Sequence, residues 1–174
     1  MNLTEEQISQ LEVLGLSQDE IDVRLNASLQ RAIQLNLLQQ PHMLWCLDIS
    51  AHIPFFAFIA NSMGHDCLST LVGVEYAEAL GCSAAPSKYA HKFDLITVFD
   101  KNLEYASESQ AREDTRRLID LLVPGGRLVV SPSVVHFHDY WVSLTWWGKL
   151  VKESEATVTR ALHAQEYWVE VKVK

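Results

Sequence analysis

The spacing of hydrophobic and polar residues predicts an alternation of strands and helices. Residues 93–99 form an apolar run rich in β-formers, which predicts a strand. In the segment 111–123, leucines recur at helical spacing among charged residues, which predicts an amphipathic helix. Pro124 and the two glycines after it stop that helix before a second strand at 127–130. Two buried strands joined by a helix indicate a right-handed crossover in a mostly parallel sheet.

The paired glycines of this segment are expected to matter for folding rather than for activity. Gly125 and Gly126 stand where a helix ends and the chain enters a strand. At least one of them is expected to adopt a positive φ, so valine at that position should cost ~1 kcal/mol or more.

Two amphipathic helices are predicted before the first strand. Thr4 with Gln7, and Ser17 with Glu20, have the spacing of capping boxes at helix starts. Apolar residues that recur about every four positions carry the second helix to about residue 38, and a proline three residues later forbids its continuation.

The middle of the chain adds two strands and a helix. Apolar runs predict a strand at 44–49, a helix at 52–63 and a second strand at 71–76. Only sixteen residues then separate Tyr76 from Phe93. This leaves little room for a further helix and a third strand between them, and we expect any such unit to be mostly missing.

The C-terminal part predicts a helix at 140–151 and an antiparallel hairpin formed by 156–162 and 167–173. On that helix, Trp146 and Trp147 lie ~100° apart, so both indoles cannot point into one narrow stripe. Trp141 also falls off the centre of that stripe. We expect one or more of the three indoles to line a cleft or an interface, and Trp147→Ala to leave the fold intact. The alternative is a helix that is buried on two sides.

Composition narrows the function classes. The chain has 174 residues, of which 48% are hydrophobic and 21% charged, as in an ordinary globular domain. Its formal net charge of −8 argues against a protein that mainly binds nucleic acid. No apolar run approaches the ~20 residues of a membrane-spanning helix. Three cysteines without CxxC spacing and an acidic, polar N-terminus predict a cytoplasmic protein with reduced thiols. From the charge and the apolar runs we expect no nucleic-acid partner and no membrane partner.

Three motifs in the second half carry a family resemblance. They are Phe-Asp-Leu at 93–95, Leu-Glu at 103–104 and Leu-Val-Pro-Gly-Gly-Arg-Leu at 122–128. In this order and spacing they resemble the class I S-adenosylmethionine-dependent methyltransferase family, of which the chain would be a degenerate, truncated member. The resemblance implies an α/β fold with a mostly parallel Rossmann-like sheet flanked by helices and a C-terminal antiparallel hairpin. It places this domain at 41–174, with an N-terminal helical segment at 1–40 packed on it.

The resemblance also implies a set of residues for the cofactor, S-adenosylmethionine. Asp48 stands at the family's acid after the first strand, but Ser50, Ala51 and His52 fill the positions of the glycines that let the backbone approach the ligand. Because side chains replace those glycines, we expect S-adenosylmethionine to bind weakly or not at all.

Three more positions complete this set. Glu75, followed by Tyr76, matches the acid whose two oxygens accept the ribose hydroxyls, although an acid at a strand end can equally be solvated. Cys82 falls at the position that contacts adenine, where a thiol is a poor acceptor. The implied cofactor residues are therefore Asp48, Ser50, Glu75, Tyr76 and Cys82.

Two residues could take a proton from a methyl acceptor. Asp100 follows the fourth expected strand, and His136 follows the fifth. His136, His138 and Asp139 could also bind a metal if the segment were extended, but no distant third ligand is evident, and an ordinary polar loop is the simpler interpretation.

The sequence leaves two functions open. One is in-line methyl transfer to an unknown acceptor, in which positioning supplies most of the rate. The other is a non-catalytic protein that keeps the methyltransferase fold and binds a protein partner or a second copy of itself. The lost glycines, the shortened middle and the cysteine at the adenine position favour the second.

Overall fold

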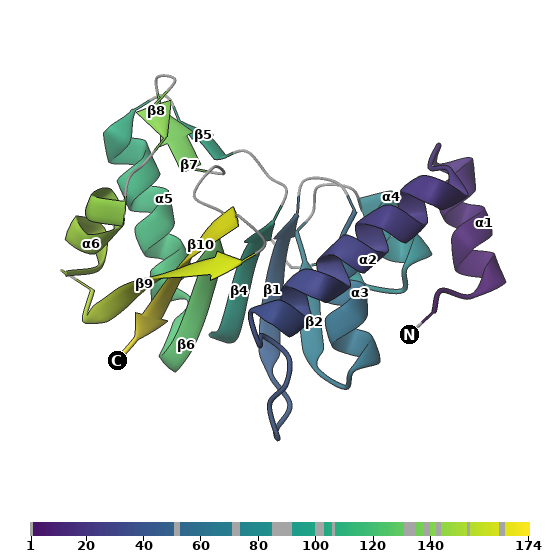
Figure 1. Cartoon of the computed structure of the whole chain (residues 1–174), viewed down its shortest axis with the longest axis horizontal. Coiled ribbons are helices and arrows are strands. Elements are labelled where there is room, and N and C mark those ends of the chain that lie inside the picture. Colours follow the sequence, from purple (N-terminus) through teal and green to yellow (C-terminus); the bar gives the residue numbers. More distant parts are fainter. Residues whose placement is uncertain are drawn as a thin grey trace. The chain divides into compact units, whose positions relative to one another are not determined.

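The computed structural model describes residues 2–50, 53–70, 74–84, 92–99, 103–105, 107–130, 135–137, 140–141, 144–152, 154–163 and 166–174. Contacts between residues divide the chain into two compact units, 1–87 and 88–174. Figure 1 labels most of the helices and strands of both units. No helix among the described residues combines the length and the apolar character needed to cross a bilayer.

The first unit begins with helices α1 (Glu5–Val13) and α2 (Gln18–Gln34). Both predicted capping boxes are confirmed: the Thr4 hydroxyl accepts from the Gln7 N–H at 3.2 Å, and the Gln7 amide oxygen accepts from the Thr4 N–H at 2.9 Å. Ser17 and Glu20 exchange the same pair of bonds at the start of α2. That helix ends at Gln34, earlier than predicted, because Asn36 turns into the left-handed region with φ 49°.

The strands of the first unit are β1 (Trp45–Ser50), β2 (Asp66–Ser69) and β3 (Ser83–Ala84), parallel and in the order β3-β2-β1. Helix α3 (Phe55–Ser62) connects β1 to β2, and α4 (Val74–Ala79) connects β2 to β3. The predicted β1 and the helix after it are confirmed.

The prediction of a second strand at 71–76 is wrong. That strand lies earlier, at Asp66–Ser69, where Cys67 pairs with Cys46 of β1. Residues from Val74 on form α4 instead, which buries Ala77 and Ala79. The buried Ala77 and Leu80 lie three residues apart, which is a helical spacing, and alanine itself favours a helix over a strand. These preferences outweigh the β-propensity of the valine and tyrosine before them.

The helix and third strand expected to be mostly missing are present in a shortened form. Helix α4 has six residues and β3 has two. Their short length agrees with the small number of residues available before β4, and it keeps the strand–helix–strand order intact.

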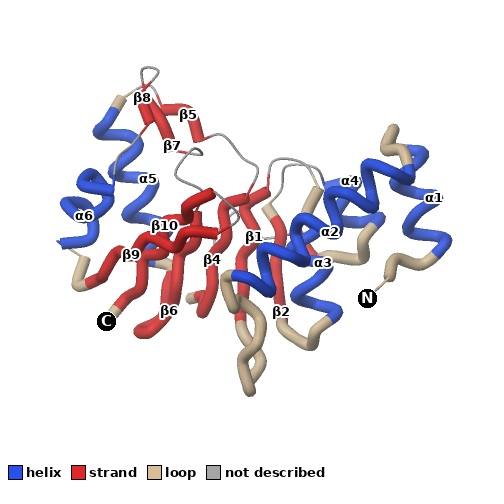
Figure 2. Tube along the Cα trace, viewed as in Figure 1, coloured by secondary structure: helices blue, strands red, loops and turns tan. Residues whose placement is uncertain are grey.

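The second unit contains β4 (Phe93–Phe99), α5 (Glu108–Asp120) and β6 (Leu122–Val130), with β4 and β6 parallel as predicted. The predicted C-terminal hairpin is confirmed as β9 (Ala156–His163) and β10 (Glu166–Val173). Strand β10 is antiparallel to β6, which gives the order β4-β6-β10-β9. Figure 2 shows these strands in red.

The same unit has a small second sheet that the sequence did not predict. Its strands are β5 (Leu103–Tyr105), β7 (Val135–Phe137) and β8 (Tyr140–Trp141), in that order. Strand β7 is parallel to β5 and antiparallel to β8.

Helix α6 (Leu144–Lys152) packs on β9 and carries the two neighbouring indoles. Trp146 and Trp147 are both buried and meet edge to face, with ring centroids 5.4 Å apart. The expectation that an indole lines a cleft or an interface is therefore wrong for Trp146 and Trp147, and the side chain of Trp141 lies outside the described residues. The helix is buried over a wider arc than one narrow stripe.

Together these elements confirm the predicted fold class. It is an α/β fold with a mostly parallel, Rossmann-like sheet flanked by helices and a C-terminal antiparallel hairpin.

Candidate functional site

The acid predicted at the end of the first strand is buried. Asp48 is 1% exposed, and its Oδ2 accepts a hydrogen bond from the Ala57 N–H at 3.2 Å. Ala57 lies in the first turn of α3, whose N-cap residue, Pro54, supplies no side-chain cap. A carboxylate at this position satisfies a free N–H and offsets the positive end of the helix dipole. Asp48 therefore caps α3 from the neighbouring strand.

The charge of Asp48 acts on two of the three buried thiols of this unit, those of Cys67 and Cys82. Cys46, Cys67 and Cys82 are all buried, and Cys46 faces Cys67 across the β1–β2 pair. Asn61 fixes the strand that carries Cys67: its Oδ1 accepts from the Cys67 N–H at 2.8 Å, and its Nδ2 donates to the Cys67 carbonyl at 3.2 Å. The same Nδ2 lies 4.0 Å from the Cys82 Sγ. The structure thus brings two predicted cofactor residues, Asp48 and Cys82, into one buried cluster.

Burial keeps the thiols of Cys67 and Cys82 protonated. It raises the pKa of Cys82 to about 12, with a smaller contribution from the negative charge of Asp48. Burial also raises the pKa of Cys67 well above its ordinary value, helped by a hydrogen bond with Cys46. A protonated, buried thiol is a weak hydrogen-bond acceptor and a poor nucleophile.

This cluster predicts a loss of stability at alkaline pH. The pKa of the Cys82 thiol is about 12 in the folded protein, against an ordinary value of 9.0. Between these pH values the unfolded state binds fewer protons than the folded state, so the free energy of unfolding falls as pH rises. By about pH 10.5 the free energy of unfolding should have fallen by ~2 kcal/mol through Cys82 alone. Denaturant unfolding of wild type and Cys82→Ala at pH 8 and pH 10.5 measures this, because ionisation elsewhere is common to both proteins. Equal alkaline losses in the two would refute it.

The predicted ribose contact, Glu75, and the predicted cofactor residue beside it, Tyr76, lie elsewhere. Glu75 and Tyr76 are on α4, beyond the carboxyl end of β2, where the sequence had placed them on a strand. The Tyr76 hydroxyl donates to the Leu14 carbonyl at 3.3 Å, which ties α4 to the end of α1. Glu75 is exposed and lines a hollow between these two helices. Neither residue joins the buried cluster of Asp48.

The carboxyl end of β2 is instead occupied by Ser69. It pairs with Asp48 across the two strands, and its buried hydroxyl has no hydrogen-bond partner among the described residues. Sequence reasoning missed both Ser69 and Asn61. The signal for Asn61 was present, since it is a polar residue at the end of an otherwise apolar helix.

The residues predicted to take a proton from the methyl acceptor were Asp100 and His136. Asp100, together with the possible metal ligands His138 and Asp139, lies outside the described residues. His136 lies on β7, where its backbone pairs with Glu104 of β5, so it belongs to a strand rather than a loop. The side chains of His136 and of Ser50 are outside the described part. Within that part, no group of three or more His, Cys, Asp or Glu side chains could hold a metal ion.

Comparisons with known proteins locate the likeness in the fold rather than in the sequence. No family model matches the chain. No curated protein sequence matches it either.

Solved structures of methyltransferases do match. The ribosomal protein L11 methylase from Lactobacillus delbrueckii subsp. bulgaricus has a TM-score of 0.56 at 16% identity, over 86% of this chain and 76% of its own. A TehB-like SAM-dependent methyltransferase from Corynebacterium glutamicum gives 0.59 at 14% identity, over 88% and 99%. The magnesium protoporphyrin IX methyltransferase of Synechocystis, solved with bound S-adenosylmethionine, gives 0.55 at 11% identity, over 100% and 86%.

Proposed function

We propose that this chain, which has the fold of the class I S-adenosylmethionine-dependent methyltransferases, uses that fold to bind a protein partner and does not transfer methyl groups. The fold itself is common to the matched structures, and fold alone does not fix function. The proposal therefore depends on the state of the residues that would hold the cofactor.

The enclosed Asp48 carries the proposal. In folds of this kind the turn after β1 and the first turn of the next helix offer free N–H groups to a ligand. Here the carboxylate of Asp48 accepts from the Ala57 N–H in that first turn and is almost inaccessible to solvent. The residues at hand do not fit S-adenosylmethionine, because Cys82 offers a protonated thiol and Glu75 lies on a helix instead of a strand end.

A second candidate is methyl transfer to an unknown acceptor. It is supported by two matched structures solved with S-adenosylmethionine, those of the glycopeptide N-methyltransferase MtfA and of the Synechocystis enzyme. In this case the bound cofactor would supply the methyl group, and Asp100 or His136 would take a proton from the substrate that receives it. Serine, alanine and histidine in place of glycines at 50–52 weigh against it.

Calorimetric titration with S-adenosylmethionine and with S-adenosylhomocysteine separates the two. We expect no saturable heat up to a ligand concentration of ~1 mM, which corresponds to less than ~4 kcal/mol of binding free energy. A dissociation constant in the low micromolar range would overturn the proposal. In that event Glu75→Ala decides whether Glu75 contacts the ligand, since loss of a hydrogen bond to a charged group should cost ~1.5–3 kcal/mol.

A further inference from the structure

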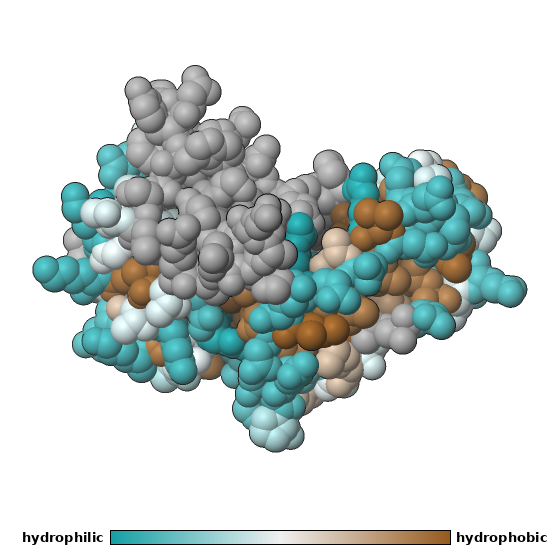
Figure 3. Space-filling model, in the orientation of Figure 1, coloured by the Kyte–Doolittle hydropathy of each residue, from teal (hydrophilic) through white to brown (hydrophobic). Residues whose placement is uncertain are grey.

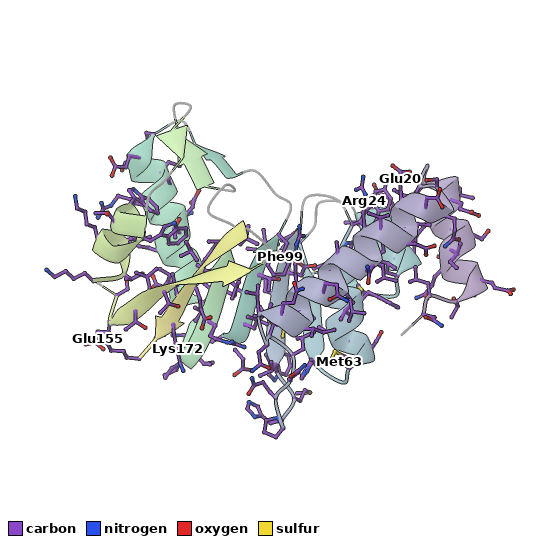
Figure 4. All side chains as sticks on the ribbon, in the orientation of Figure 1. Glu20, Arg24, Met63, Phe99, Glu155 and Lys172 are labelled. Atoms are coloured by element: carbon purple, nitrogen blue, oxygen red, sulfur yellow. The ribbon has the colours of Figure 1, made fainter. Side chains whose placement is uncertain are left out.

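The negative charge of the chain belongs to one of its two units. Residues 1–87 contain ten acidic residues and two arginines, whereas residues 88–174 contain twelve acidic and twelve basic residues. The whole formal net charge of −8 therefore lies in the first unit. Its first 23 residues contain six acids and no lysine or arginine. The first base, Arg24, stands one turn after Glu20 on α2 (Figure 4). Hydrogen bonds with the Ser17 backbone and side chain lower the pKa of Glu20, and the charge of Arg24 makes a smaller contribution.

A hollow opens between two helices of this unit. It has a volume of about 410 Å³ and is lined by residues of α1, by Leu14 at the C-cap of α1, and by residues of α4. Glu75 and Glu78, one turn apart on α4, provide two exposed carboxylates. Val13, Leu14 and Ala79 provide its apolar lining. Every charge in the lining is therefore negative.

The hollow is held in shape by contacts between its two walls. The Tyr76 hydroxyl of α4 donates to the Leu14 carbonyl, and the Gln7 side chain of α1 donates to the Leu80 carbonyl at 3.2 Å. The capping box of α1 fixes the start of that helix. A partner would therefore meet a preformed surface and would not have to order it.

Exposed hydrophobic side chains accompany the charge. Val13 is 86% exposed at the edge of the hollow. Among the described residues, all the large hydrophobic side chains that are exposed belong to the first unit: Val13, Val23, Ile33, Met43, Trp45 and Met63. Figure 3 shows brown hydrophobic atoms among the teal atoms of its helices. A surface with exposed apolar side chains beside charges of one sign suits an amphipathic partner of the opposite charge.

We propose that the α1–α4 hollow is a docking site for a basic segment of a partner protein, one that places an apolar side chain on Val13 and Leu14 and a lysine or arginine against Glu75 and Glu78. This inference rests on the proposed partner-binding function and names the chemistry of the partner. Charge complementarity selects a cationic segment, and it excludes a nucleic acid, whose phosphates the acidic unit would repel.

Fluorescence anisotropy with labelled peptides tests the site on the full-length chain. The probe is a short helical peptide with lysines on one face and leucines on the other, and its control has glutamines in place of the lysines. We expect the lysine peptide to bind saturably and the glutamine peptide to bind at least about tenfold more weakly. Binding of the lysine peptide should weaken as salt is raised, because the carboxylates are exposed.

A matched pair of variants separates the hollow from general charge. Glu75→Gln with Glu78→Gln removes the two carboxylates of the lining, whereas Asp19→Asn with Asp22→Asn removes the same charge from exposed positions on α2. The first pair should weaken peptide binding by about tenfold and the second by less than about threefold. Equal weakening by both pairs, or no binding to the wild type, overturns the proposal. The calorimetric titration with S-adenosylmethionine tests the proposed function independently of this result.

Discussion

Replacing Trp147 with alanine is expected to lower the free energy of unfolding by about 3–5 kcal/mol, the usual range for truncating a buried tryptophan. Trp147 is 1% exposed and lies edge to face against Trp146 on the helix that packs on β9. Alanine would leave a large cavity there and remove the aromatic contact. Denaturant unfolding followed by circular dichroism measures the change.

Trp45→Ala is the matched control. This second indole is 37% exposed at the start of β1, so its truncation leaves no closed cavity and should cost less than about 1 kcal/mol. If Trp147→Ala cost no more than Trp45→Ala, the buried position of α6 would be contradicted. The original expectation of a tryptophan at an interface would then be restored.

Helical spacing in the sequence correctly predicted a helix at α6 but not how much of its surface is buried. The buried arc depends on how many elements cover the helix, which the spacing does not contain. The capping boxes of α1 and α2 were predictable because their bonds join residues three apart in the sequence. The same holds for the hairpin of β9 and β10, whose alternating pattern is local.

Strand β2 shows where local patterns fail. Its sequence, Asp-Cys-Leu-Ser, has no β-branched residue, whereas the Gly-Val-Glu-Tyr that follows reads as a strand. What makes 66–69 the strand is its pairing with β1, which buries Cys67 and Ser69. That pairing is a non-local contact that no short window contains.

The candidate site divides in the same way. Asp48 could be recognised by its position after an apolar run, but its bond to Ala57 depends on how α3 starts relative to β1. Glu75 was predicted to contact ribose because it follows Gly-Val in a motif that lies at a strand end. In the structure it lies on the helix α4 and faces α1. Residue types were thus predictable and their partners were not.

Gly126→Ala is expected to destabilise the chain by about 2–3 kcal/mol, as overpacking does in a tightly packed site. A Cβ on Gly126 would lie 2.8 Å from the Val123 carbonyl oxygen and 3.0 Å from that of Phe93, both of them backbone atoms that cannot rotate away. The contact arises where the β4–β6 pairing shifts register, between Phe93 and Leu95.

Gly125 is the natural comparison, because its φ of +80° is strained for other residues but nothing lies within 4 Å of the added Cβ. Gly125→Ala should therefore cost only about 1–2 kcal/mol, and Gly125→Asn less, since asparagine tolerates the left-handed region. Thermal and denaturant unfolding of the three variants should give the order Gly126→Ala, Gly125→Ala, Gly125→Asn from the least to the most stable. A fully stable Gly126→Ala protein would show that β4 and β6 do not approach each other at this register shift.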